Sequence, residues 1–158
     1  MRIRYTLFVA ALVGTGACTD RPAAEDLPEA GLSSFSVDRS GHDFGRVPID
    51  GGVVEAVFHV VNDGPDQVRL LSVSTSCGCT TALAVFTDGS TVGSYDAPAG
   101  SQDAGRIVRT GESFQVQVKF DPAAHGPNGV GQLMREVILA TLDGVPTRLV
   151  ITADVFRG

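Results

Sequence analysis

The residues of this sequence best suited to chemistry are Cys77 and Cys79, which flank a single glycine in the stretch SCGCT at positions 76–80. The chain has only three cysteines in 158 residues, so two of them at this spacing need an explanation. Three explanations are open. The pair could be buried, unreactive thiols or a quiet disulfide, a reducible disulfide with a redox role, or two thiolate ligands for a soft metal ion.

The alternation of residue types around the pair predicts a straight strand. A period of two from Leu71 through both cysteines to Val85 places the two thiols on the core-facing side. The two Cα atoms would then lie about 6.6 Å apart with parallel side chains, near the upper limit for a disulfide. A disulfide would need the chain to curl at Gly78, and the strained bond would be easy to reduce.

A metal site at the pair would need ligands that the sequence does not place beside it. The histidines are His42, His59 and His125, and we interpret each as a surface or packing residue. Two thiolates alone can hold Cu(I), so copper or zinc is the alternative to an expectation of no cofactor. The sequence contains no serine or cysteine nucleophile motif with histidine and no phosphate-binding glycine loop. We therefore expect no enzymatic activity, and a thiol redox role stays open.

Short strands must position these thiols, because a period of two dominates from Phe35 onward. In FQVQVKF, residues 114–120, apolar and polar side chains alternate, and VVEAVFHVVN at 53–62 repeats the pattern. Further strands are predicted at 67–76, 134–142 and 147–156, with short edge pieces at 35–37 and 44–47. About seven short strands separated by turn signals predict an all-β sandwich of two antiparallel sheets.

Residues 87–111 interrupt this pattern with a stretch rich in glycine, serine, aspartate and alanine. A loop of this length inside a compact domain is either a disordered surface excursion or a binding loop, and the composition favours the first.

The N-terminal residues predict export. Arg2 and Arg4 precede an apolar run that is too short to span a bilayer, and small residues follow it up to Cys18. This pattern predicts a lipoprotein signal peptide at 1–17 with a lipid on Cys18; ordinary secretion is the alternative. Polar residues 18–34 are predicted to be a flexible tether. The net charge of −6 and the lack of a basic cluster argue against nucleic acid as a partner.

Three motifs occur in one order: HDFGRV at 42–47, SCGCTT at 76–81 and GESFQVQVKFDP at 111–122. Together they resemble the bacterial family called domain of unknown function fifteen-seventy-three. The resemblance covers about residues 35–158. It implies an immunoglobulin-like sandwich, related to Hydin-type and major-sperm-protein-like modules, that is exported and often lipid-anchored. It implies no activity. The motif residues for which it implies structural roles are His42, Asp43, Phe44, Gly45, Gly78 and Thr80.

We therefore expect an exported, lipid-anchored immunoglobulin-like module that binds or scaffolds an unknown protein partner at the bacterial cell envelope, facing the periplasm or the cell surface. Membrane contact is expected through the lipid on Cys18. The alternative is a thiol redox or Cu(I)/Zn(II)-handling protein that uses Cys77 and Cys79. Exposure distinguishes the two, because buried sulfurs would oppose chemistry and sulfurs at a strand end in a cleft would support it.

Overall fold

The computed structural model describes residues 34–93, 105–142 and 144–158. The predicted signal peptide, and the predicted tether except Ser34, lie outside the described residues. Within the described ranges, no helix has the length and apolar character needed to cross a bilayer. These ranges contain one 3₁₀ turn, η1 (Gly126–Asn128), and ten strands: β1 (Ser36–Val37), β2 (Gly41–Pro48), β3 (Val54–Val61), β4 (Val68–Thr75), β5 (Thr80–Phe86), β6 (Thr91–Gly93), β7 (Arg106–Val108), β8 (Ser113–Phe120), β9 (Gly131–Thr141) and β10 (Thr147–Phe156).

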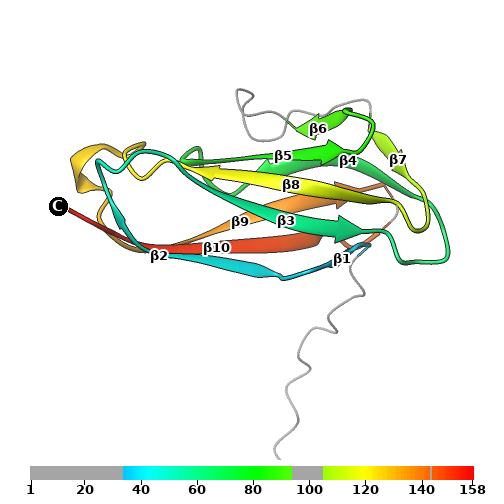
Figure 1. The fold of residues 1–158 in the computed structure, drawn as a ribbon, viewed down its shortest axis with the longest axis horizontal. Coiled ribbons are helices and arrows are strands. Elements are labelled where there is room, and N and C mark those ends of the chain that lie inside the picture. The colour runs from blue at the N-terminus through cyan, green and yellow to red at the C-terminus, as the bar shows by residue number, and fades with distance from the viewer. Residues whose placement is uncertain (1–33, 94–104, 143) are drawn as a thin grey trace, which may run out of the picture.

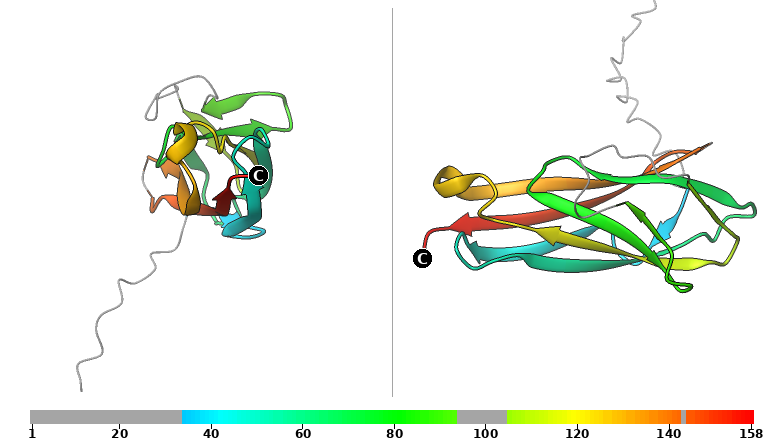
Figure 2. Two further views of the ribbon diagram at one scale, coloured as in Figure 1. Left: turned by 90° about the vertical axis from the view of Figure 1, so that its left-hand side faces the viewer. Right: turned by 90° about the horizontal axis from the view of Figure 1, so that it is seen from above.

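The strands form two sheets that stack face to face (Figures 1 and 2). One sheet has the order β1-β3-β8-β5-β6 and the other the order β2-β10-β9-β4-β7. Neighbouring strands are antiparallel except β2 and β10, which are parallel. The predicted all-β, immunoglobulin-like sandwich is confirmed. The described residues contain more strands than the expected seven, because the predicted long strand is split into β4 and β5, and the predicted loop at 87–111 contains β6 and β7.

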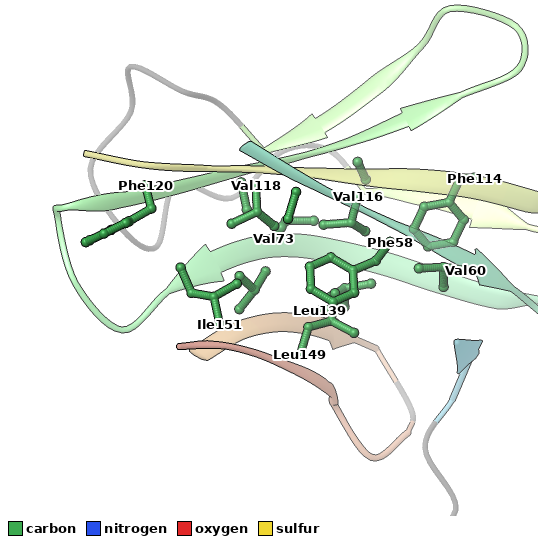
Figure 3. Close-up of a cluster of buried hydrophobic side chains, with 14 of the residues drawn as sticks. Phe58, Val60, Val73, Phe114, Val116, Val118, Phe120, Leu139, Leu149 and Ile151 are labelled. Carbon is green, nitrogen blue, oxygen red and sulfur yellow. The ribbon is translucent and has the colours of Figure 1, made fainter. Parts of the chain in front are cut away.

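The core lies between the two sheets, where the alternating apolar side chains meet. In β8, Phe114, Val116, Val118 and Phe120 are all buried, as the alternation predicts. Figure 3 shows side chains of both sheets packed together, with Phe58 of β3 close to residues of β9 and β10. Phe58 is 0% exposed and is among the largest fully buried side chains of the described residues.

The two ends of the first sheet are distinguished by their strand pairing. At one end Thr80, Phe120 and Val54 lie side by side across β5, β8 and β3. At the other end Val37 of β1 pairs with Val60 of β3. Six residues along β3 separate the two ends, a distance of about 20 Å. The described chain therefore enters the sandwich at the end opposite to Thr80.

Candidate functional site

The SCGCT stretch forms the corner at which the chain passes from one sheet to the other. β4 ends at Thr75 and β5 begins at Thr80 in the opposite sheet, so residues 76–79 are a turn. The Thr75 hydroxyl donates to the Thr80 carbonyl oxygen at 2.7 Å and lies 3.1 Å from the carbonyl oxygen of Cys77. The Thr80 amide donates to the same Cys77 oxygen at 3.0 Å. The predicted straight strand through both cysteines is therefore wrong. We call residues 75–80 the thiol corner.

The change of sheet also breaks the predicted alternation. A bulge between Leu70 and Ser72 in β4 buries Leu70, and Leu71 is only half-buried. In β5, Ala82 is buried and Leu83 is half-buried, which is the reverse of the prediction. A period of two identifies a face only while the chain stays in one sheet, because a turn between sheets resets the phase.

The two thiols differ in their exposure. Cys79 is 3% exposed and belongs to the hydrophobic core, whereas Cys77 is half-buried and packs against the edge of that core. The Cys79 amide donates to the Cys77 sulfur at 3.3 Å, and both cysteines are free thiols. The prediction that both sulfurs point into the core is thus correct for Cys79 and wrong for Cys77.

Two side chains from distant parts of the sequence approach the thiols. The Nε2 atom of His125 lies 3.1 Å from the Cys77 sulfur. The Nε–H of Arg135 donates to the Cys79 sulfur at 3.3 Å. The structure therefore places an imidazole beside the more exposed thiol and a guanidinium beside the buried one.

His125 is positioned by the turn that follows β8. The Asp121 amide donates to the Cys79 carbonyl oxygen at 2.9 Å, which ties the start of this turn to the thiol corner. The Asp121 carboxylate accepts the Ala123 amide at 2.9 Å, and the Gly126 amide donates to the Ala123 carbonyl oxygen at 2.8 Å. These bonds fold the chain back so that His125 faces Cys77.

Arg135 reaches Cys79 from the other sheet. It lies opposite Ile151 in the pairing of β9 with β10, and Ile151 is fully buried. Directly opposed residues share a face of the sheet, so the Arg135 side chain leaves β9 on the core-facing side. It spans the gap between the sheets at their open end and arrives at the Cys79 sulfur.

The surroundings of the thiols separate their pKa values. Partial burial of Cys77 disfavours its thiolate and would raise its pKa. Hydrogen bonds from the Cys79 thiol and amide and from His125, together with the positive charge of Arg135, outweigh this effect. They lower the Cys77 pKa from 9.0 to about 6. Burial, followed by the neighbouring Cys77, raises the pKa of Cys79. The hydrogen bond to Cys79 raises the pKa of Arg135. Cys77 is therefore the thiol that ionises first.

The other two residues of the CGCT motif have different structural roles. Thr80 is buried at 1% exposure and accepts the Thr75 hydroxyl through its carbonyl oxygen. Gly78 has no positive φ, and a Cβ atom added to it would meet nothing within 4 Å. The turn therefore does not use the conformational freedom that the sequence suggested for Gly78.

The HDFG motif lies on edge strand β2. Gly45 has φ +64°, and its amide donates to the Asp43 carboxylate at 2.9 Å. The Phe44 ring stacks on Phe120 at 6.3 Å and meets the His42 ring edge-on at 4.6 Å. These contacts shape and seal the edge of the sandwich. They do not bring His42 or Asp43 into the thiol cluster, which among the described residues consists of Cys77, Cys79 and His125.

Sequence reasoning treated His125 as a surface or packing residue and did not single out Arg135. A signal for His125 was present, because the turn at 121–129 follows the strand that ends at Phe120. Phe120 pairs with Thr80 at the thiol corner, but this pairing is visible only once the sheet is formed. The predicted lipid site at Cys18 lies outside the described residues.

Comparison with known families supports the resemblance drawn from HDFG and CGCT. Residues 35–87 match the family described as protein of unknown function (DUF1573). The DUF1573 segment runs from the start of β1 past the end of β5, so it contains Cys77 and Cys79. His125 and Arg135 lie beyond it. No curated protein matches the chain significantly.

Solved structures with a similar fold have low sequence identity to this chain. A protein of unknown function from Porphyromonas gingivalis W83 has a TM-score of 0.55 at 18% identity, covering 82% of this chain and 51% of its own. This chain thus spans about half the length of that protein. The ASH/PapD-like domain 7 of human CEP192 has a TM-score of 0.44 at 13% identity, covering 97% of this chain and 99% of the domain. At 18% identity, the likeness to the Porphyromonas protein establishes the fold alone.

Proposed function

We propose that this protein is an exported, lipid-anchored immunoglobulin-like module that exchanges disulfides with a protein partner at the cell envelope through Cys77 and Cys79. The observation that carries the proposal is the unequal placement of the two thiols. Cys77 is half-exposed beside an exposed histidine, and Cys79 is buried directly behind it. This arrangement suits an attacking thiol and a resolving thiol.

The exchange needs two steps. The Cys77 thiolate attacks a disulfide of the partner, so that a Cys77–partner S–S bond forms and the partner's other sulfur leaves as a thiolate. Cys79 then gives its proton to that leaving thiolate and attacks the Cys77 sulfur. The Cys77–Cys79 bond forms, and the first partner sulfur leaves as a thiolate. The partner disulfide is reduced, the dithiol is oxidised, and the reverse sequence would oxidise a reduced partner.

The position of the thiol corner supports action away from the membrane. The described chain begins at Ser34, at the end of the first sheet opposite to Thr80. A lipid on Cys18 would therefore hold the sandwich by the far end and present Cys77 to partners beyond the membrane surface.

The Cys18→Ser protein tests this proposal, because only Cys77 and Cys79 remain as cysteines. Adding Cys79→Ser should leave Cys77 able to form a stable mixed disulfide with glutathione disulfide, which intact mass detects. The matched Cys77→Ser variant should react far more slowly, since Cys79 is 3% exposed. If both folded variants fail to react, or if Cys79 reacts as fast as Cys77, the proposal is wrong.

A second candidate is non-covalent binding of a protein partner, favoured by a groove on the outer face of β2, β10 and β9. The groove has a volume of about 490 Å³ and is lined by Asp43, Arg46, Met134 and Asp154, among others. Met134 is 63% exposed, and a flexible thioether is common on binding surfaces. A partner that binds through this groove should be lost on Met134→Asp and kept when both cysteines are replaced by serine. The opposite pattern would assign the partner to the thiol corner.

A further inference from the structure

We propose that Cys77, Cys79 and His125 form a binding site for Cu(I), with Arg135 as the neighbouring positive charge that balances the site. The two sulfur atoms and the imidazole nitrogen lie within 4.8 Å of one another. The thiols come from the β4–β5 corner and the imidazole from the turn after β8. The fold therefore brings together donors as far apart in the sequence as Cys77 and His125, which are separated by 48 positions.

The spacing of the donor atoms fits a three-coordinate ion. Ligands bound at about 2.2 Å around a trigonal centre lie about 3.8 Å from one another. The Cys77 sulfur and His125 Nε2 are now 3.1 Å apart. They would have to move apart by about 0.7 Å to reach the trigonal spacing. His125 is exposed and lies in a turn, and Cys77 is half-buried, so both side chains have room for this adjustment.

The donor types select a soft ion. Thiolate sulfur and imidazole nitrogen favour Cu(I) and Zn(II) over hard cations. Structural zinc sites almost always have four protein ligands. Among the described residues, the cluster of potential metal ligands contains three. The Arg135 guanidinium lies at the Cys79 sulfur, on one side of this cluster.

The charge of Arg135 distinguishes the two ions. Two thiolates with Cu(I) carry a net charge of −1, which the guanidinium 3.3 Å from the Cys79 sulfur would neutralise. Two thiolates with Zn(II) are already neutral, so the same guanidinium would have no charge to compensate. Within the part of the chain that the structure describes, no carboxylate forms an ion pair with Arg135. A half-buried cation without an acidic partner is best satisfied by an anionic site.

The site is also accessible from solvent. A cavity of about 270 Å³ lies beside it, lined by His125, Arg135, Phe120, Gly129 and Leu133, among others. This cavity exposes His125 and Arg135 to an incoming ion, and Cys77 is itself half-exposed.

This inference shares its cysteines with the proposed disulfide exchange but does not depend on that exchange. Copper binding needs both thiols reduced and needs His125. Disulfide exchange needs the two thiols and no histidine ligand. A loss of one property can therefore be separated from a loss of the other.

The test is Cu(I) binding by the reduced Cys18→Ser protein under anaerobic conditions, in competition with bathocuproine disulfonate. We expect one Cu(I) per chain with thiolate-to-copper absorption in the ultraviolet. Replacing Cys77 or Cys79 by serine should abolish this binding. The His125→Asn variant should lose at least about tenfold in affinity, while the matched His59→Asn variant, altered at an exposed histidine of β3, should bind normally.

Arg135→Gln tests the charge argument. The substitution should lower the affinity for Cu(I) and leave the affinity for Zn(II) unchanged or higher. The ratio of the Cu(I) affinity to the Zn(II) affinity should therefore fall. The His125→Asn protein should still form a mixed disulfide with glutathione. Circular dichroism shows whether each variant is folded. The proposal is overturned if the folded, reduced protein binds no Cu(I), if His125→Asn binds as tightly as the parent, or if Zn(II) is preferred to Cu(I).

Discussion

At the scale of single residues, Cys77 and Cys79 differ because their neighbours differ. The Cys77 sulfur accepts a hydrogen bond from the Cys79 amide and lies beside His125, whereas Cys79 lies in the core and contacts Arg135. Two residues of one type, two positions apart, thus acquire opposite pKa shifts from burial and hydrogen bonding.

The ionisation of Cys77 can be measured by alkylation. Because its pKa is lowered to about 6, the thiolate predominates at neutral pH, and the reaction with iodoacetamide should rise between about pH 5 and 7 and then level off. Arg135→Gln and His125→Asn should each move this profile to higher pH, since each removes a partner of the thiolate. Peptide mass spectrometry follows Cys77 and Cys79 separately. A Cys77 rate that still rises steeply above pH 8 would contradict this prediction.

Alanine substitutions at two motif glycines, Gly45 and Gly78, should affect stability differently. Gly45→Ala should lower the free energy of unfolding by about 1 kcal/mol, because Gly45 has φ +64° and alanine is strained there. Gly78→Ala should change it by less than about 0.5 kcal/mol, since Gly78 has an ordinary φ and open space around it. Urea unfolding of the two variants gives the comparison. Equal losses in both would show that the turn at Gly78 is under constraint.

At the scale of elements, the decisive feature is the crossing of the chain between sheets at the thiol corner. β4 pairs with β9 in one sheet, and β5 pairs with β8 in the other. The turn between them therefore lies at the open end of the core, where Arg135 of β9 and the turn after β8 both arrive. The site exists because four elements meet at this end.

Thr75→Val tests how the corner is held. The hydroxyl of Thr75 contacts two carbonyl oxygens of the corner, so its loss should lower the free energy of unfolding by about 1 kcal/mol. The control is Thr81→Val on β5, because among the described residues the Thr81 hydroxyl has no hydrogen bond; its effect should stay below about 0.5 kcal/mol. Urea unfolding measures both, and a larger loss for Thr81 would contradict this account.

At the scale of the whole molecule, the sandwich separates the end at which the described chain begins from the thiol corner. The described chain begins beside β1, and the thiol corner lies at the other end of the same sheet. If the proposed lipid on Cys18 anchors the protein, the thiol corner lies at the end of the sandwich farther from that anchor.

Cys18→Ser tests the proposed anchor. In a bacterial host that processes lipoproteins, the parent protein should fractionate with membranes and incorporate labelled palmitate, and the variant should do neither. Cys77→Ser serves as the matched control. It should remain membrane-bound, since the substituted residue lies in the sandwich and Cys18 is unchanged. Recovery of the Cys18→Ser protein in the membrane fraction would show that another interaction holds it there.

The alternating patterns in β3 and β8 were sufficient to predict strands and their inward faces, and the β10 segment was predicted as a further strand of a two-sheet sandwich. Phe58 and Val116 are buried as expected, because each alternation reflects one strand whose two faces meet core and solvent. The same reasoning gave the wrong face for Leu83. A local period carries no information about the sheet to which the next strand belongs.

The sequence by itself determined the strand-forming segments and the presence of a cysteine pair, since both depend on neighbouring residues. Only the tertiary structure decided which thiol is exposed and which side chains face it. His125 and Arg135 lie 48 and 56 positions from their cysteine partners, and nothing local relates them. Their convergence follows from the pairing of β5 with β8 and the stacking of two sheets, which depend on the packing of the whole core.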